Sequence, residues 1–240
     1  MAVYQTLSAA RQAPVAYKGA HAGIAPLREV HRSACYDYRL APECLGGAAK
    51  RALDVLIAGA ALLVLSPLLA IVALIVRLES PGPALFKQRR TGFRGRSFYI
   101  FKFRSMRAME SGRNVRQAVK GDPRVTLFGA FLRRSSIDEL PQLLNVLRGE
   151  MSIVGPRPHA LNHDADFYSI IGAYPGRFLA RPGITGLAQV SGARGETDTP
   201  DKVRTRVSLD LQYVRNWSFL GDLHIMVKTF SVVLCGRNAF

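Results

Sequence analysis

Cysteine is scarce in this sequence, and the few cysteines present form no close pair. There are three, Cys35, Cys44 and Cys235, and none lies at the short spacing of a metal-binding pair. This scarcity excludes a disulfide-stabilised scaffold and a cysteine zinc site, and it agrees with a reducing compartment.

Acidic residues are also few. Asp and Glu number 17 against 33 Lys and Arg, so the formal net charge of the 240 residues is +16. That balance excludes an acidic, disordered chain and calls for an anionic partner such as nucleic acid, lipid headgroups or a phosphorylated ligand. Because 48% of the residues are hydrophobic as well, the combination favours a membrane surface over DNA.

Several common motifs are missing. The sequence has no Walker loop, no Gly-x-Gly-x-x-Gly and no Gly-x-Ser-x-Gly. Residues 1–49 contain no apolar run of the kind found in a signal peptide and no sustained periodicity. We therefore expect a flexible N-terminal tail over 1–49 rather than a cleaved leader.

One apolar run dominates the chain. It extends from Ala52 to Val76, with Lys50 and Arg51 before it and Arg77 after it. A helix of about 25 residues at about 1.5 Å per residue could cross a bilayer core of about 30 Å. A transmembrane helix is therefore the first interpretation.

Two features favour a re-entrant helix over residues 50–77 instead. Basic residues at both ends lack the asymmetry between the inside and the outside that a spanning helix shows. Pro67 in the middle removes a backbone donor and clashes with the preceding turn, and Ser66 can bond the freed carbonyl. We expect a helix–break–helix anchor at Ser66-Pro67; a kinked transmembrane helix is the alternative.

Residues 78–240 contain no second apolar run long enough to span a membrane, and they predict a catalytic domain. A short strand is expected over 98–103 and helices over 127–132, 139–147 and 201–217. An amphipathic helix over 219–234 would lie on the core or on the membrane surface. The predicted fold class is mainly α with a small β element (α+β).

The adjacent carboxylates Asp138 and Glu139 are open to two interpretations. Ser136 with Glu139 three residues later matches a capping box, which would make both acids purely structural. The nearby Arg133 and Arg134 favour a site instead, where one carboxylate attacks phosphorus and the other holds a divalent cation.

The basic residues between 87 and 107 are similarly ambiguous. They could form a face toward anionic lipid; they are Lys87, Arg89, Arg90, Arg94, Arg96, Lys102, Arg104 and Arg107. Arg157 differs, since Pro156 and Pro158 stiffen its backbone and suit it to phosphate recognition. His159 and His163 are spaced as metal ligands can be, but no third ligand is evident, so a metal site there is not expected.

Taken together, these motifs resemble the bacterial sugar transferase family, the monotopic phosphoglycosyl transferases of exopolysaccharide-initiating type. The resemblance runs from Lys50 to about Leu234 and includes the acid- and proline-containing stretch 136–158. Its ordered blocks are Lys50-Arg51-x-x-Asp54, Ser66-Pro67, Lys102-Phe103-Arg104-Ser105-Met106, Asp122-Pro123-Arg124-Val125-Thr126, Ser136-Ile137-Asp138-Glu139-Leu140-Pro141-Gln142, Gly149 to Pro158, Arg181-Pro182-Gly183-Ile184-Thr185-Gly186 and Asp210 to Trp217.

The resemblance implies a mechanism. Asp138 would attack the β-phosphorus of a UDP-sugar, expel UMP, and pass glucose- or galactose-1-phosphate to undecaprenyl phosphate. Glu139 would hold Mg²⁺. The substrate-binding residues implied are Lys102, Arg133, Arg157 and, in support, Asp210. The resemblance also places the enzyme at the bacterial inner membrane, with anionic lipid around the re-entrant anchor, a catalytic domain on the cytoplasmic face and a homodimer as a further option.

One position departs from the family pattern. Relatives carry Arg directly after a Gly, whereas this chain has Gly192-Ala193-Arg194. Arg194 therefore either substitutes from one residue later or leaves a weakened contact, which would fit a catalytically weakened scaffold or regulator. The third option, a membrane-anchored nucleic-acid binder, lacks any motif that reads a nucleic-acid groove, so no nucleic acid is expected.

Overall fold

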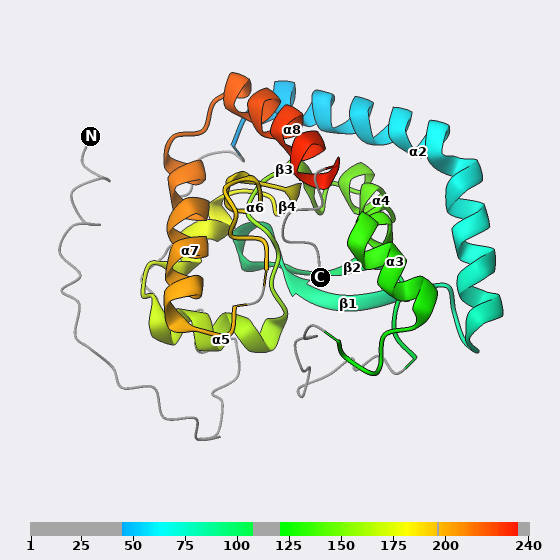
Figure 1. The fold of residues 1–240 in the computed structure, drawn as a ribbon. Helices are drawn as coiled ribbons and strands as arrows, with labels where there is room; N and C mark the ends of the chain where they lie inside the picture. Colours follow the sequence, from blue (N-terminus) through cyan, green and yellow to red (C-terminus); the bar gives the residue numbers. More distant parts are fainter. Residues whose placement is uncertain (1–44, 108–120, 196, 235–240) are drawn as a thin grey trace, which may run out of the picture.

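The computed structural model describes residues 45–107, 121–195 and 197–234. Figure 1 shows a mainly helical fold with two small sheets, which confirms the expected fold class at that level. The main elements are α2 (Gly47–Glu79), β1 (Leu85–Thr91), β2 (Ser97–Phe103), α3 (Leu127–Ser135), the 3₁₀ turn η3 (Ile137–Glu139), α4 (Gln142–Leu147), β3 (Ser152–Val154), α5 (Leu161–Ile170), the 3₁₀ turn η4 (Tyr174–Leu179), β4 (Gly183–Thr185), α6 (Leu187–Val190), α7 (Pro200–Arg215) and α8 (Phe219–Leu234).

Both sheets are two-stranded. β1 and β2 pair antiparallel as a hairpin, with Leu85 opposite Phe103 and Thr91 opposite Ser97. β3 and β4 pair in parallel. The proline- and glycine-rich residues 154–158 and 181–186 predict loops, but the first segment overlaps the end of β3 and the second contains β4. The predicted tail lies outside the described residues except for 45–49, and α2 already begins at Gly47.

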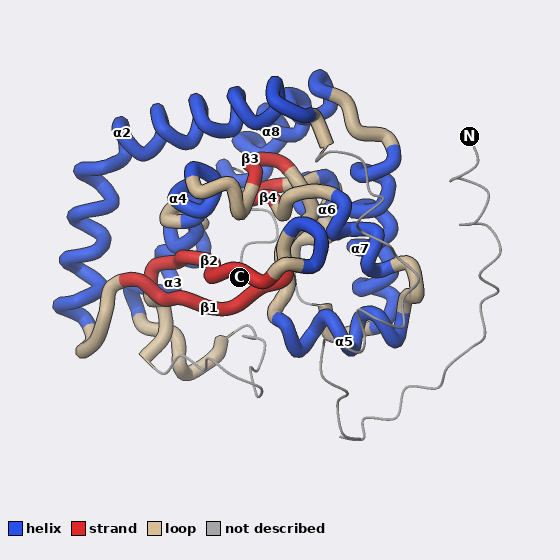
Figure 2. The backbone as a smooth tube through the Cα atoms, turned by 180° about the vertical axis from the view of Figure 1, so that it is seen from behind, coloured by secondary structure: helices blue, strands red, loops and turns tan. Residues whose placement is uncertain are grey.

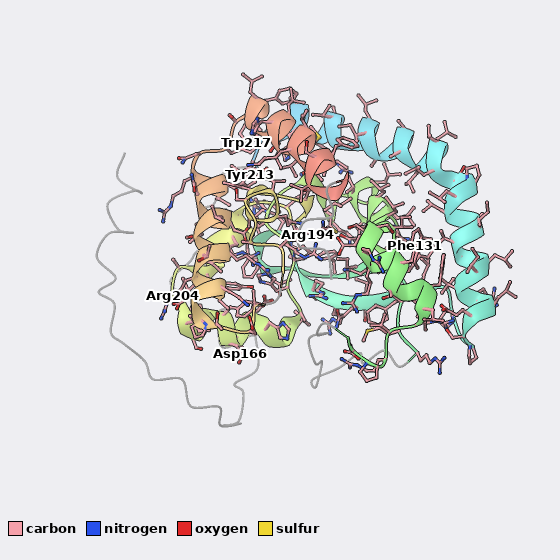
Figure 3. All side chains as sticks on the ribbon, viewed as in Figure 1. Phe131, Asp166, Arg194, Arg204, Tyr213 and Trp217 are labelled. Carbon is pink, nitrogen blue, oxygen red and sulfur yellow. The ribbon has the colours of Figure 1, made fainter. Side chains whose placement is uncertain are left out.

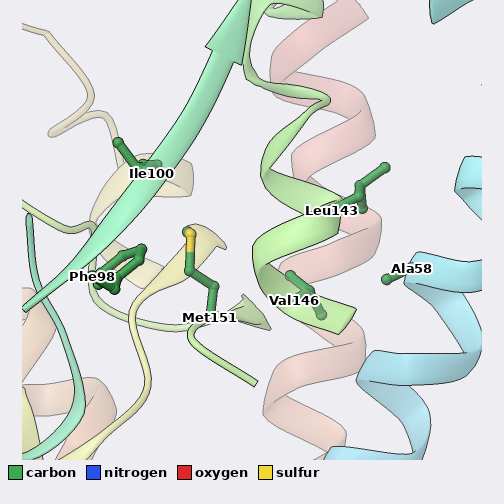
Figure 4. Packing of buried hydrophobic residues seen from close by; sticks show 6 residues of the cluster. All are labelled: Ala58, Phe98, Ile100, Leu143, Val146 and Met151. Atoms are coloured by element: carbon green, nitrogen blue, oxygen red, sulfur yellow. The ribbon is translucent and has the colours of Figure 1, made fainter. Parts of the chain in front are cut away.

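The strand β2 is joined to α4 by one amide side chain. Asn145 is fully buried; its Oδ1 accepts from the Phe101 amide at 3.0 Å, and its Nδ2 donates to the Tyr99 carbonyl at 2.7 Å. A side-chain amide thus takes the place of a neighbouring strand at this edge. Around it packs an apolar cluster that joins α2, β2 and α4 (Figure 4), namely Ala58, Phe98, Ile100, Leu143, Val146 and Met151.

The apolar helix α2 bends without breaking into two helices. It is one element of 33 residues with Pro67 inside it, and both views of the backbone show a sharp bend along its length (Figures 1 and 2). Ser66 Oγ donates to the Leu63 carbonyl at 2.8 Å. This carbonyl lies four residues before Pro67 and cannot receive the missing proline N–H, so the predicted compensation by Ser66 is confirmed.

Polar residues at the start of α2 fasten it to the rest of the domain. Lys50 Nζ pairs with Asp222 Oδ2 on α8 at 2.6 Å and also donates to the Val154 carbonyl at 3.1 Å. Arg51 donates to the Val146 carbonyl at 2.6 Å. Asp54 Oδ1 accepts from the amide of Ile153 at 2.9 Å. The charges at the beginning of this apolar helix therefore serve docking between α2, α4, β3 and α8.

The other end of α2 is fastened to the same domain. Arg104, which directly follows β2, is buried and donates to the carbonyls of Val76, Ser80 and Pro81. The Phe128 amide at the start of α3 donates to Glu79 Oε1 at 2.8 Å. The expectation that Arg104 faces lipid is therefore wrong, because its guanidinium satisfies the carbonyls that the helix end leaves unpaired.

Much of the apolar surface on α2 faces outward. In the most apolar window of this helix only 11% of the residues are buried, which distinguishes it from the core helix of a soluble domain. On α8, Leu220, Val227 and Phe230 are also exposed while Asp222 and Ile225 are buried. Among the described residues, α2 is the one helix long and apolar enough to cross a membrane.

The buried pair of Lys50 with Asp222 generates a stability prediction. We expect Asp222→Ala to lower the free energy of unfolding by about 3–5 kcal/mol, because the Lys50 ammonium is left buried without its counter-charge. Thermal unfolding of the purified protein in detergent would measure this change. Asp201→Ala, at an exposed helix position, is the matched control with a change within about 0.5 kcal/mol. Equal changes for the two variants would contradict the prediction.

Candidate active site

Glu139 is the point where three segments meet. Its Oε1 accepts from Lys102 Nζ on β2 at 2.8 Å, and its two oxygens receive both Nη groups of Arg157 at 2.5 and 3.1 Å. Burial opposes the ionised form of Glu139, but Arg157 and Lys102 outweigh it and hold the pKa well below its ordinary value. The structure thus brings together three residues that the sequence analysis assigned to one site.

Asp138, the neighbouring carboxylate, is in a different electrostatic situation. It is 8% exposed. Among the described residues, no lysine or arginine donates a hydrogen bond to its carboxylate, in contrast to Glu139, which accepts from Lys102 and Arg157. Burial raises the pKa of Asp138 to about 6, with Lys102 acting in the opposite direction and Glu139 adding to the rise. The two adjacent acids are therefore one fixed, firmly ionised group and one that titrates near neutrality.

The capping box that local pattern allowed is not formed. Ser136 makes no side-chain cap bond to η3, and Glu139 turns toward the two cations instead. Ser136 also lies in the left-handed region, with φ of 59° between α3 and η3. A non-glycine residue in this region carries about 1 kcal/mol or more of backbone strain. That conformation turns the chain sharply just before Asp138.

Arg194 reaches this same turn from the loop between α6 and α7. Its guanidinium donates to Ser136 Oγ. Burial lowers the pKa of Arg194. Glu139 and Asp138 raise this pKa and Arg157 lowers it, so the Arg194 charge interacts electrostatically with all three of these residues. The arginine that stands one position late in the sequence therefore does arrive beside the carboxylates.

Arg133 and Arg90 add positive charge around the carboxylates. Arg133 lies in the last turn of α3, and its charge lowers the pKa of Asp138. Burial and the nearby Arg157 lower the pKa of Arg90 to about 10, against the pull of Asp164 and Glu139. Arg90 is half-buried, and its guanidinium donates to the Pro158 carbonyl at 3.5 Å and to the Gln88 side chain, so the expectation that it faces lipid is wrong.

Asp210 does not face Glu139 but supports Arg157 from behind. It is completely buried on α7, and its Oδ2 accepts from Arg177 Nε at 2.8 Å. Arg177 in turn donates to the backbone carbonyl of Arg157 at 2.5 Å. In the described structure Asp210 is therefore a partner of Arg177, one step removed from the position a substrate-binding residue would need.

His159 belongs to the same buried network. Its Nδ1 lies 2.7 Å from Tyr174 Oη, which donates to Asp164 Oδ1 at 2.5 Å, and Thr91 donates to the other oxygen of Asp164. Burial, with Arg177 next in size, lowers the pKa of His159 well below its ordinary value, so it is neutral at pH 7. Residues 45–107, 121–195 and 197–234 contain no cluster of three or more His, Cys, Asp or Glu suited to a metal.

The donor chemistry of Glu139 still fits one magnesium ion held mainly by a bound phosphate. A carboxylate has about four acceptor positions, and three of them are used by Lys102 and Arg157. One position on Oε2 remains. Mg²⁺ commonly binds one or two carboxylates and takes its other ligands from phosphate and water.

The arrangement is suited to phosphoryl transfer. One unbonded, buried carboxylate adjoins a fixed one, and cationic groups surround both: Lys102, Arg133, Arg157, Arg194 and Arg90. Positive charge in excess over the two carboxylates needs an anionic ligand such as a diphosphate. A carboxylate beside bound phosphate can act as a nucleophile on phosphorus.

Two buried arginines of this region are absent from the predicted site. Arg206 is detectable in principle, because it shares the apolar face of α7 with Val203, Val207 and Asp210 at helical spacing. Arg177 has no such signal, since it lies in η4 and its partners are brought to it by other segments.

Comparison with known proteins identifies similar sequences. The family model for bacterial sugar transferases matches residues 45–236. A UDP-glucose:undecaprenyl-phosphate glucose-1-phosphate transferase of Caulobacter vibrioides is 53% identical over 192 residues, 80% of this chain and 72% of the relative. One of the same name from Escherichia coli is 52% identical over 180 residues, 75% of this chain but 39% of that longer relative. The exopolysaccharide production protein ExoY of Rhizobium meliloti is 41% identical over 213 residues, 82% of this chain and 90% of the relative.

The contrast between the two acids predicts opposite effects on stability. Asp138→Asn should raise the melting temperature at pH 7.5 by about 2–4 °C, because folding no longer buries a charge whose pKa is raised. Glu139→Gln should lower it by about 6–12 °C, because charged hydrogen bonds to Lys102 and Arg157 lose their counter-charge. Thermal unfolding of both variants measures the difference. Shifts in the same direction would show that the two environments are not distinct.

Proposed function

The chain belongs to the bacterial sugar transferase family, and from that membership we propose that it transfers glucose-1-phosphate from UDP-glucose to undecaprenyl phosphate. The names of the relatives in Caulobacter vibrioides and Escherichia coli support the donor and the acceptor. The single observation that carries the proposal is the pair of unlike carboxylates, Asp138 and Glu139, on one turn among the basic residues of the site.

Asp138 is the nucleophile in this proposal. Its carboxylate oxygen attacks the β-phosphorus of the UDP-sugar, forming an acyl-phosphate bond while the bond from that phosphorus to the bridging oxygen breaks and UMP leaves. Among the described residues, its carboxylate accepts no hydrogen bond from a lysine or arginine, whereas Glu139 accepts from Lys102 and Arg157. The oxygens of Asp138 are therefore available for attack. A pKa of about 6 leaves most of it ionised at neutral pH while keeping it more nucleophilic than an ordinary aspartate.

The basic residues bind and orient the donor. Glu139 already orients the guanidinium of Arg157 and the ammonium of Lys102. Both cations would also interact with the diphosphate as it enters the site. Arg133, in the last turn of α3, and Arg194, which donates to Ser136 Oγ, add further positive charge. Together they offset the negative charge that otherwise repels an attacking carboxylate.

Glu139 would be the protein ligand of Mg²⁺. When bound there with the diphosphate, the ion would stabilise negative charge on the phosphate oxygens and on departing UMP. Lys102 and Arg157 hold the Glu139 carboxylate ionised and oriented whether or not an ion is present.

The second step would return the enzyme to its starting state. A phosphate oxygen of undecaprenyl phosphate attacks the phosphorus held on Asp138, the acyl-phosphate bond breaks, and the carboxylate is released. This step needs the site at the surface of the membrane that holds the lipid, which we take to be the cytoplasmic face of the inner membrane. Anionic headgroups there would attract the excess of basic residues.

The bent helix α2 supports a re-entrant anchor over a straight span. Its first turn is held by Asp222 and Val154, and its last turn by Arg104 and Phe128, all in the one domain that follows it. If that domain remains on one side of the membrane, both ends of α2 are on that side too. Pro67 and the exposed apolar residues around it would then be the part that enters the lipid.

No observation favours the scaffold that the sequence analysis kept as an alternative. Its support was the displaced arginine, and Arg194 lies at the site beside Ser136. A nucleic-acid binder is not supported either, since Arg177 and Arg206 are buried and Lys102 and Arg157 are paired with Glu139.

The transferase is tested by a panel of UDP-sugars incubated with undecaprenyl phosphate and Mg²⁺. We expect UMP release from UDP-glucose, its loss with EDTA and its return with added Mg²⁺. Asp138→Asn should lower the rate by at least about 10³-fold without unfolding the protein, and Asp166→Asn, on an outward-facing position of α5 in Figure 3, is the matched control. Full activity in Asp138→Asn would remove its assignment as nucleophile, and no UMP from any donor would remove the proposed function.

The re-entrant anchor is tested by labelling in a cysteine-free variant. Single cysteines at Gly47 and Glu79, the two ends of α2, should both react with a membrane-impermeant maleimide in inside-out vesicles and neither in right-side-out spheroplasts. Reaction of one end from each side would establish a spanning helix instead.

A further inference from the structure

A buried arginine on α7 forms hydrogen bonds to the backbone of the loop that carries Arg194. Arg206 is 6% exposed. Its Nε donates to the Ala193 carbonyl at 2.9 Å, and one of its Nη groups donates to the Gly195 carbonyl. These two carbonyls flank Arg194 on either side, so one guanidinium holds the backbone both before and after that residue.

These two hydrogen bonds restrict the positions that the Arg194 side chain can reach. With its backbone held at both neighbours, Arg194 extends to Ser136 Oγ, beside the turn that carries Asp138 and Glu139. The Ala193 amide also donates to the Ala188 carbonyl at 2.9 Å, which ties the loop to α6. Arg194 is half-buried and lies over the middle of the fold in the view of Figure 3, whereas Arg204, two residues from Arg206 on α7, points away from the fold.

Packing alone does not account for a charged residue at this position. Burial and Arg157 lower the pKa of Arg206 to about 10, so it is still cationic at pH 7, and Asp210 one turn along α7 partly offsets the charge. A buried ion is disfavoured relative to an apolar side chain of similar volume. The carbonyls of Ala193 and Gly195, however, match the planar guanidinium, which holds its donors in a fixed fork, whereas the donors of lysine rotate on one flexible ammonium.

We propose that Arg206 is a positioning residue that fixes the 193–195 loop, so that Arg194 serves as a cationic contact for the diphosphate of the donor. The proposal deepens the proposed function and rests on it, since it is the transferase that needs a cation there. It gives a physical reason why an arginine one place late in the chain still arrives at the site.

A double-mutant cycle tests whether Arg206 acts through Arg194. We expect Arg206→Lys and Arg194→Ala each to lower kcat/KM for UDP-glucose about tenfold, and the double variant to be no worse than Arg194→Ala alone. Arg204→Lys, whose side chain is exposed and paired with Asp201, should leave kcat/KM unchanged. Losses that multiply to about a hundredfold in the double variant would overturn the proposal.

Hydrogen–deuterium exchange provides a readout that needs no activity. The peptide that contains residues 191–195 should exchange about tenfold faster in Arg206→Lys than in the wild type, because the loop loses one of its two side-chain bonds, while Arg204→Lys should not change it. Unchanged exchange would overturn the role of Arg206. Should Arg206→Lys not fold, Arg206→Gln, which also lacks the forked donor, takes its place in both measurements.

The two measurements keep this proposal apart from the proposed function. If the wild type releases no UMP from any UDP-sugar, the transferase and the diphosphate contact both fall. The exchange experiment would still decide whether Arg206 positions Arg194.

Discussion

The site depends on the two ion pairs of Glu139. Lys102 comes from β2, Glu139 from η3 and Arg157 from a loop after β3, and in the chain they are separated by 37 and 18 residues. Three segments that share no secondary structure are joined by one carboxylate. Burial raises the pKa of the neighbouring Asp138, Lys102 acts against that rise, and the ionised Glu139 carboxylate adds to it.

Around the residues that contact Glu139, arginine side chains donate hydrogen bonds to backbone carbonyls that a larger sheet would satisfy in other folds. Arg177 holds the backbone of Arg157, Arg206 holds that of the loop around Arg194, and Arg104 holds the end of α2. Each uses several donors of one side chain to satisfy carbonyls in irregular segments. With only two-stranded sheets in the described residues, loops near the site have few backbone partners, and arginine supplies them.

Features that depend on neighbouring residues are predictable from the sequence. The bend in α2, the compensation by Ser66 and the strand predicted over 98–103, which is Ser97–Phe103 in the structure, all follow from residues that are close together in the chain. A prediction from local pattern is wrong where a distant partner competes with a local one. The capping box of Ser136 and Glu139 is satisfied by sequence spacing, but two cations from other segments offer Glu139 a stronger interaction than one backbone amide.

The sequence by itself determined the apolar helix, its central bend and the α+β class, and through resemblance it predicted which acids and bases form one site. Only the tertiary structure decided how each of these charges is used. Arg104 and Arg90 are basic residues in the same stretch as Lys87, yet Arg104 is buried at a helix end and Arg90 is half-buried beside the site, while Lys87 is exposed. The physical reason is that the residue type sets the charge of a side chain, whereas segments far away in the chain determine whether the side chain is buried and which groups it contacts.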